Sequence, residues 1–288
     1  MLSIRNLGKS FDKVQVLEDL SWDVPDAQIL GLIGSNGAGK STLLRCISQV
    51  YEYEKGEVFF NGEAIELQLD KLFFVSDEPF YLSRFTTAEM KNFYKSFYPK
   101  FSDEYYRYLL GVFHFDEQKP IYKLSKGLKR QCALILGMSC KPELLLMDES
   151  FDGLDPMMRL TLKRELIRLV SEEKISVVIS SHNIRELEDI CDGMALLENR
   201  SIVFTQTLDE LNHNYHKVQL GYREKPDPAL FAGMPLLNYE INNKIVTVTY
   251  KGQEAASLLR KTGAILTNPM PISMEEIFVA EMEAKHGK

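Results

Sequence analysis

The chain has 288 residues, of which 45% are hydrophobic and 26% are charged, a composition typical of a soluble protein with a sizeable core. Its formal net charge of -7 argues against non-specific binding to DNA or RNA, which requires clustered cations. The longest apolar runs are shorter than the roughly 20 residues of a membrane helix. Because the N-terminus also lacks the pattern of a secretory signal, we expect a cytoplasmic protein.

The first part of the chain reads as strands around one glycine-rich turn. Residues 1–11 and 16–25 alternate apolar and polar side chains, and residues 28–34 form the continuous apolar run of a buried strand. Residues 41–50, after the turn, have helical spacing, so this region predicts the first half of a parallel β-α-β unit. Residues 56–65 predict a hairpin with Asn61 and Gly62 at its turn.

From residue 86 to residue 138 the pattern becomes helical and rich in aromatics. Pro99 is expected to break one helix, and Ser102, followed by two acidic residues, to begin another. This region predicts a helical subdomain inserted into an α/β core. Its aromatics are interpreted as a core with one exposed binding face.

The second half continues the α/β pattern. Two more buried strands, over 143–149 and 175–182, flank a helix predicted over 156–173. After about residue 212, strand and helix signals alternate around a proline-rich joint. We therefore predict two domains, 1–212 and 213–288, the second a small accessory α+β domain. The four cysteines show neither a C-x-x-C pair nor a histidine at ligand spacing, so they are expected to be core thiols.

Residues 34–41, GSNGAGKS, fit the phosphate-loop pattern G-x-x-x-x-G-K-[ST]. Glycines let backbone N–H groups turn toward phosphates, the lysine reaches the β and γ oxygens, and the hydroxyl binds Mg2+. The pattern stands between a predicted strand and a predicted helix, as this function requires. The expected nucleotide-binding residues are Gly34, Ser35, Asn36, Gly37, Ala38, Gly39, Lys40, Ser41 and Thr42.

The apolar strand 143–149 ends in Asp148 and Glu149. Alone, this pattern is equally consistent with a plain strand end, but a preceding phosphate loop favours a catalytic pair. Asp148 and Ser41 are then expected to hold Mg2+, and Glu149 to polarise an attacking water.

Residues 124–137, LSKGLKRQCALILG, narrow the class, because here the sequence resembles the ATP-binding cassette (ABC) family and its LSGGQ signature. Leu124, Ser125 and Gly127 match that signature, whereas Lys126 and Leu128 stand where the family commonly has Gly and Gln. The GLD of residues 153–155 and the strand ending in His182 continue the family order. The resemblance covers about residues 1–210.

The resemblance implies roles for further residues. Ser125, Gly127 and Asp155 would contact nucleotide, and His182 would donate a hydrogen bond to the γ-phosphate. Phe11 would stack on adenine, although an ordinary core phenylalanine is nearly as consistent with the sequence.

A second Asp–Glu pair, in VSDEP (75–79), falls where the family has its Q-loop, and puts Asp77 at the position of the glutamine. Its carboxylate would face Mg2+ and take part in catalysis. The alternative is that Asp77 only caps the turn before Pro79. The aromatics Phe80, Tyr81 and Phe85 follow, where the family receives a coupling helix from its membrane subunit; core packing is the alternative for each.

The implied fold is a P-loop NTPase (ABC ATPase) core with an antiparallel β subdomain and a helical subdomain, and the implied cofactors are ATP and Mg2+. Two copies, or one copy and a paralogous ATPase subunit, would enclose two ATP molecules between them. The chain would then hydrolyse ATP for a membrane transporter, bound to an integral-membrane permease on the inner face of the cell membrane. Residues 271–282 resemble the ending of bacterial ABC-2-type export subunits, which favours export. The LSKGLKR variant and the DEP loop resemble the same group, including YtrB-type subunits.

Two other functions fit the sequence less well. A soluble ABC-type ATPase acting on ribosomes or DNA is less consistent with a single cassette and an acidic balance, and no nucleic-acid partner is expected. A small-molecule kinase that shares only the phosphate loop leaves residues 124–127 and His182 unexplained.

Overall fold

The structure, a computed structural model, describes residues 1–82 and 84–286. The chain divides into two compact units, Met1–Thr205 and Gln206–Lys288. No helix in the described ranges is long and apolar enough to cross a membrane. Short 3-10 turns lie at Ile65–Leu67, Leu69–Lys71, Ile121–Lys123 and Pro228–Leu230.

The first unit contains a four-stranded antiparallel sheet in the order β2-β1-β4-β5. Its strands are β1 (Leu2–Phe11), β2 (Val14–Val24), β4 (Lys55–Phe60) and β5 (Glu63–Ala64). The turn between β4 and β5 has positive φ at both central residues, Asn61 (52°) and Gly62 (82°), as a type I′ turn requires. The predicted hairpin is therefore confirmed.

The second sheet of this unit has six strands in the order β10-β9-β3-β8-β7-β6. The strands are β3 (Ile29–Ile33), β6 (Leu72–Val75), β7 (Leu144–Asp148), β8 (Ser176–Ser181), β9 (Gly193–Glu198) and β10 (Ser201–Thr207). From β9 to β6 the pairing is parallel, and every residue of β3, β7 and β8 is buried. The carboxyl ends of these three strands therefore meet at one edge of the sheet.

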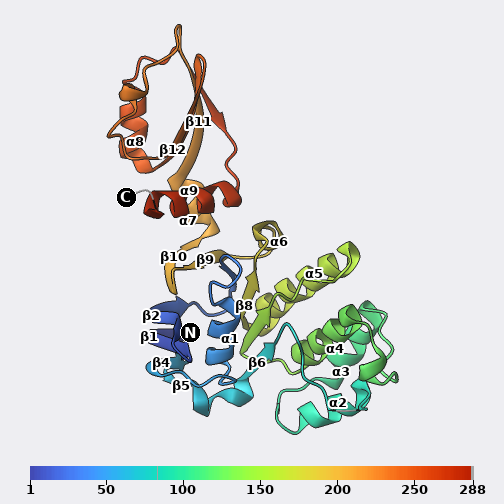
Figure 1. Cartoon of the computed structure of the whole chain (residues 1–288). Helices are drawn as coiled ribbons and strands as arrows, with labels where there is room; N and C mark the ends of the chain where they lie inside the picture. The colour runs from blue at the N-terminus through green and yellow to red at the C-terminus, as the bar shows by residue number, and fades with distance from the viewer. Residues whose placement is uncertain (83, 287–288) are drawn as a thin grey trace. The chain divides into compact units, whose positions relative to one another are not determined.

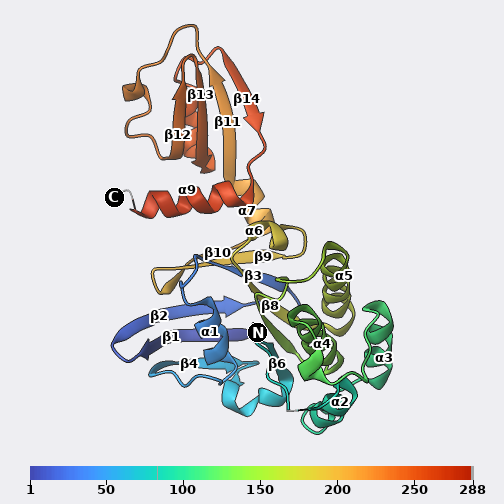
Figure 2. The same ribbon diagram turned by 45° about the vertical axis from the view of Figure 1, so that its right-hand side comes forward.

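Helix α1 (Lys40–Ile47) lies between the two sheets, and its Leu43, Leu44 and Ile47 pack in one core with residues of both. Figures 1 and 2 show α1 and α5 (Pro156–Glu173) on opposite sides of the parallel sheet. A short helix, α6 (Ile184–Glu188), follows β8. The predicted layering of an α/β core is confirmed.

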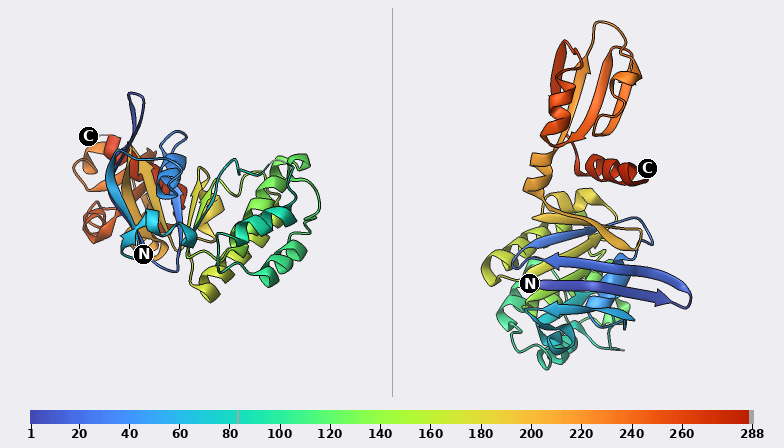
Figure 3. Two further views of the ribbon diagram at one scale, coloured as in Figure 1. Left: turned by 90° about the horizontal axis from the view of Figure 1, so that it is seen from below. Right: turned by 90° about the vertical axis from the view of Figure 1, so that its left-hand side faces the viewer.

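The helical subdomain consists of α2 (Thr87–Lys95), α3 (Asp103–Val112) and α4 (Lys126–Ser139), which gather to one side of the sheets in Figure 3. Ser102 caps α3 as predicted, because its hydroxyl accepts the N–H of Tyr105 at 3.1 Å. Helix α2 ends at Lys95, before Pro99, so this proline lies beyond the helix end rather than breaking the helix itself.

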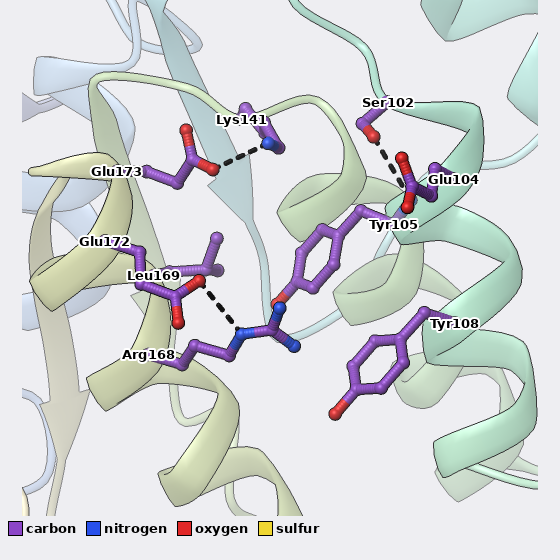
Figure 4. A pocket seen from close by; sticks show the side chains of 9 residues that line it. All are labelled: Ser102, Glu104, Tyr105, Tyr108, Lys141, Arg168, Leu169, Glu172 and Glu173. Carbon is purple, nitrogen blue, oxygen red and sulfur yellow. Dashed lines mark hydrogen bonds and ion pairs between the residues drawn. The ribbon is translucent and has the colours of Figure 1, made fainter.

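A buried carboxylate ties the helical subdomain to α5. Tyr105 and Tyr108 of α3 donate to the two carboxylate oxygens of Glu165, at 3.0 and 2.9 Å. The guanidinium of Arg168 lies over both rings, 5.7 and 5.0 Å from their centroids. Tyr105, Tyr108 and Arg168 also line a cavity of about 260 Å³ between α3 and α5, and Figure 4 shows the Arg168 guanidinium beside the two rings. Burial, followed by the Glu165 charge, raises the pKa of Tyr105, which keeps its hydroxyl a donor.

The second unit is a four-stranded antiparallel sheet with α8 on one face. Its strands, in the order β12-β13-β11-β14, are β11 (Tyr215–Gly221), β12 (Leu236–Asn242), β13 (Ile245–Lys251) and β14 (Leu266–Met270), and its helices are α7 (Leu208–Asn214), α8 (Gly252–Leu259) and α9 (Met274–His286). Val218, Leu220, Val246 and Val248 pack against Leu259 of α8. The unit is α+β, as the sequence predicts.

The four cysteines, Cys46, Cys132, Cys140 and Cys191, are all buried and free. Burial raises the pKa of Cys46 to about 12 and that of Cys132 to about 11, so both remain thiols at neutral pH. The prediction of core thiols is confirmed.

Changing both Tyr105 and Tyr108 to Phe should lower the free energy of unfolding by ~1–3 kcal/mol, because the buried Glu165 carboxylate loses both donors. Urea denaturation measures this. Tyr122→Phe is the matched control, since Tyr122 is 58% exposed. Equal free energies of unfolding for the double variant and the control would show that the hydrogen bonds to Glu165 do not stabilise the fold.

Candidate nucleotide-binding site

The phosphate loop runs from the end of β3 into the start of α1, and its glycines are required there. Gly37 and Gly39 have φ of 83° and 108°, in the left-handed region. A Cβ on Gly34 would lie 2.3 Å from the carbonyl oxygen of Leu197. The backbone therefore adopts the tight turn that phosphate binding needs, at the N-terminus of α1.

Lys40 lies over this loop. Its side chain is 6% exposed, and Nζ donates to the carbonyl oxygens of Gly34 and Ser35 at 2.8 and 3.1 Å. Burial lowers the pKa of Lys40, while the charges of Glu149 and Asp148 act in the opposite direction. A buried ammonium beside backbone N–H groups is suited to a phosphate anion.

The rest of the loop is more open. Ala38 donates its N–H to the carbonyl of Ser35 at 3.1 Å, and the Ser35 hydroxyl lies 3.1 Å from Glu198 Oε2. Asn36 is exposed and Thr42 is half-buried. These residues remain predicted nucleotide contacts.

Asp148 is fully buried at the end of β7. Its Oδ1 accepts from Ser41 at 3.1 Å and from Ser180 at 2.6 Å. Its Oδ2 is buried and has no hydrogen-bond partner among the described residues. An orphaned carboxylate oxygen beside a serine hydroxyl fits a Mg2+ site, because Mg2+ prefers hard oxygen ligands.

Glu149 is held by contacts on its backbone as well as its side chain. Its φ is 45°, its N–H donates to the Ser180 hydroxyl at 3.1 Å, and its Oε2 lies 2.8 Å from Nδ1 of His182. Ligand atoms of Glu149, Asp152 and His182 all lie within 4.8 Å of one another. The structure thus brings together Lys40, Asp148, Glu149 and His182, which the sequence predicts to act on one phosphate group.

Asp77 forms an ion pair with a cation of helix α1. Its Oδ1 accepts from NH2 of Arg45 at 2.6 Å, so its described partner is a cation on α1. Its backbone carbonyl accepts from Arg130 at 2.8 Å. Contact of Asp77 with Mg2+ therefore stays a prediction.

Phe11 lies at the end of β1 and is 40% exposed. Its ring meets that of Tyr51 edge to face, with centroids 5.3 Å apart, and Lys9 Nζ lies 5.0 Å from its centroid. A phenylalanine that is 40% exposed is compatible with stacking on a base.

Ser125, Gly127 and Asp155 lie at two helix starts. Ser125 caps α4 by accepting the N–H of Leu128 at 3.3 Å, and Asp155 caps α5 by accepting the N–H of Met158 at 3.0 Å. A Cβ on Gly127 would lie 3.0 Å from the carbonyl oxygen of Gly153, so the two turns abut. In the described ranges, the partners of these residues belong to these turns rather than to the phosphate loop.

An aromatic groove of about 450 Å³ lies beside the segment that follows β6. Its aromatic lining consists of Phe73, Phe74, Phe80, Tyr81, Tyr94 and Tyr98. Phe80 is 78% exposed, whereas Tyr81 donates its hydroxyl to the carbonyl of Lys129 and has a pKa raised by burial. Phe85 is half-buried. The predicted coupling aromatics therefore divide into an exposed residue and partly packed ones.

A family model described as ABC transporter matches residues 17–152. Over 290 residues the chain is 31% identical to the ABC transporter ATP-binding protein YtrB of Bacillus subtilis, with 99% of each chain covered. The chain belongs to the ABC transporter ATP-binding proteins. Both the family and the similarity to YtrB are as the sequence motifs predict.

Other similar proteins are also ATP-binding proteins or cassettes of ABC transporters. The methionine import ATP-binding protein MetN of Clostridium tetani is 30% identical, with 70% of this chain and 68% of MetN covered. A solved ATP-binding subunit of an ABC transporter is 25% identical, with a TM-score of 0.68 and coverage of 74% and 92%. A solved dimeric bacterial ABC transporter cassette, 18% identical, shares the fold with a TM-score of 0.65 over 72% of this chain and 99% of its own. The chain is accordingly an ABC ATPase.

Sequence reasoning missed one central residue of this ABC ATPase, Arg130. It is 3% exposed and donates to the backbone carbonyls of Asp77, Glu149 and Asp152, the first at 2.8 Å and the last at 3.0 Å. Its signal in the sequence was a charged residue at the start of the largely apolar segment 130–138. Ser180, which bonds both Asp148 and Glu149, was missed as well, because a serine inside a strand carries no distinct pattern.

We expect the pKa of His182 to lie above 6.5 in the folded chain, because the Glu149 hydrogen bond and charge raise it. The His182–Glu149 pair therefore stabilises the fold below pH 6.5, where His182 is protonated. This contribution to stability is lost as the pH rises through the raised pKa of His182. An NMR titration of the His182 ring should give a lower midpoint in Glu149→Gln. Glu172→Gln, at a 58% exposed side chain, should leave the midpoint unchanged. Identical midpoints in wild type and Glu149→Gln would contradict the pairing.

Proposed function

We propose that this ABC ATPase is the energy-supplying subunit of a membrane transporter, in which ATP closes a dimer of ATPase subunits and hydrolysis reopens it. One observation carries the proposal: Lys40, Asp148, Glu149 and His182 meet at one sheet edge, while the signature turn at Ser125 lies at the start of another helix. A site built this way holds only half of the predicted contacts to each ATP. The other half would come from a second copy or a paralogous subunit.

The proposed roles follow from the contacts. Ser41 and Asp148 would hold Mg2+, which neutralises phosphate charge when bound. Lys40, with the N–H groups of the phosphate loop, binds the phosphates. Glu149 polarises the attacking water. The hydrogen bond from its N–H to the Ser180 hydroxyl fixes its backbone and so helps to orient its carboxylate.

His182 orients the Glu149 carboxylate and, when protonated, donates toward it and toward phosphate. Phe11 offers a ring face for adenine. Ser125, Gly127 and Asp155 would contact the ATP bound to the partner subunit.

The membrane partner is proposed to dock in the aromatic groove. The groove presents a 78% exposed phenylalanine, Phe80, directly after the segment that contains Asp77. Exposed aromatics in a concave surface are characteristic of protein docking sites. This surface favours a permease partner over a soluble ATPase that acts on ribosomes or DNA, and it implies a location on the inner face of the cell membrane.

Export is the proposed direction. Residues 271–282 resemble the ending of export subunits, and the similarity to YtrB continues through this region.

Glu149→Gln should lower ATP turnover about 100-fold or more while nucleotide still binds, because a general base is lost but the phosphate contacts remain. The variant should also elute with ATP as a dimer on a sizing column. Glu172→Gln is the exposed control and should keep wild-type turnover. Wild-type turnover in Glu149→Gln would refute its role as base.

Phe80→Ser should reduce the amount of membrane protein that co-purifies with the chain, because it removes the most exposed aromatic of the groove. The probe is the product of an adjacent reading frame that encodes about six apolar helices, each of roughly 20 residues. Ile167→Ser, at a 48% exposed residue of α5, is the control for surface hydrophobicity. Co-purification that is equal for both variants would exclude the groove as the docking site, and a wild-type chain that captures no such protein would refute the transporter role.

A further inference from the structure

Arg45 lies where the nucleotide site and the aromatic groove meet. It is on α1, the helix that begins at Lys40, and its NH2 donates to Asp77 Oδ1 at 2.6 Å. It also lines the aromatic groove. The two side chains are 24% and 39% exposed, so the ion pair is partly shielded from water.

The position of Arg45 is fixed by the chain that follows α1. Its carbonyl accepts the N–H groups of Val50 and Tyr51 at 2.9 and 3.0 Å, and its guanidinium lies 5.6 Å from the Tyr51 ring centroid. Tyr51 in turn contacts the ring of Phe11. A continuous series of contacts therefore runs from Phe11 through Tyr51 and Arg45 to Asp77.

Asp77 is held from a second side through its backbone. Arg130 of α4 donates to the Asp77 carbonyl and also to the carbonyl of Asp152. Since the backbone of Asp77 is anchored to α4 while its carboxylate is anchored to α1, the Arg45 contact decides which way the carboxylate points. The Arg130 guanidinium also donates to the carbonyl of Glu149, the neighbour of Asp148, so one side chain ties the Asp77 backbone to the backbone of the Asp148–Glu149 pair.

We propose that Arg45 is a positioning residue, which holds the Asp77 carboxylate on the groove side and withholds it from the metal position at Ser41 and Asp148. The pair would thus make an aspartate tolerable at a point where a free carboxylate would face phosphate and metal. The inference rests on the proposed ATP site. It assigns to Arg45 a part that neither the phosphate loop nor the signature predicts.

A structural role alone would have different consequences. Partly exposed ion pairs contribute little to stability, so Arg45→Gln should leave the chain folded. In Arg45→Gln the Asp77 carboxylate loses its partner, so an additional charged oxygen becomes available to bind Mg2+. The effect must then depend on the presence of the Asp77 carboxylate.

The test is nucleotide binding by the full-length chain, measured with a fluorescent non-hydrolysable ATP analogue while Mg2+ is titrated. We expect Arg45→Gln to lower the half-saturating Mg2+ concentration about threefold or more. The double variant Arg45→Gln with Asp77→Asn should lose this effect and match Asp77→Asn alone. Arg45→Lys, which keeps a cation, should restore most of the wild-type Mg2+ dependence and also covers the case in which Arg45→Gln fails to fold.

Arg5→Gln is the matched control, because Arg5 makes an ion pair of 2.8 Å with Asp23 on the antiparallel sheet and should leave the titration unchanged. An Arg45→Gln curve that superimposes on wild type, or an equal shift with and without the Asp77 carboxylate, would overturn the proposal. These outcomes are separate from failure of the proposed function. No binding of the analogue by wild type would refute the ATP site, and absence of a membrane partner would not affect this measurement.

Discussion

The hydrogen bonds to Asp148 join the three segments on which the site depends. Ser41 ends the phosphate-loop sequence, Ser180 belongs to β8, and Asp148 ends β7, so one buried carboxylate links all three segments. The link forms because β3, β8 and β7 are adjacent and parallel, which brings their carboxyl ends to the same edge. The cost of burying this charge is offset by its donors, and its free oxygen creates the place for a cation.

Arg130 extends this arrangement to the helical subdomain. A buried guanidinium can donate in several directions at once, and here it binds backbone carbonyls rather than carboxylates. Its partners belong to the segments that contain Asp77, Glu149 and Asp152. Movement of α4 would therefore displace all three segments together. Glu165, which ties α3 to α5, gives the subdomain a second attachment to the core.

The departures from the family pattern fall on surfaces where a partner is expected. Lys126 and Leu128 are both exposed at the start of α4, and Asp77 is more than one-third exposed. Lys40, Asp148, Glu149 and His182, which meet at one sheet edge, show no such departure. The predicted phosphate contacts therefore keep the family's residue types, while the exposed start of α4 carries an additional cation and an apolar side chain.

Much of the fold was determined by local sequence. The Asn61–Gly62 turn, the Ser102 cap and the buried strands each depend on residues close together in the chain, so their patterns were sufficient to predict them. The phosphate loop and the Asp148–Glu149 pair were equally predictable, because their chemistry fixes both residue type and spacing.

Only the tertiary structure decided which distant side chains meet. The Asp77–Arg45 pair joins residues 32 positions apart, and Ser180 reaches Asp148 across 32 positions. No local pattern marks either contact, because an arginine on a helix and a serine in a strand are compatible with many surroundings. The sequence by itself determined the elements and the chemical groups, and strand order and helix packing determined which of those groups share a site, since such contacts depend on the whole chain being folded.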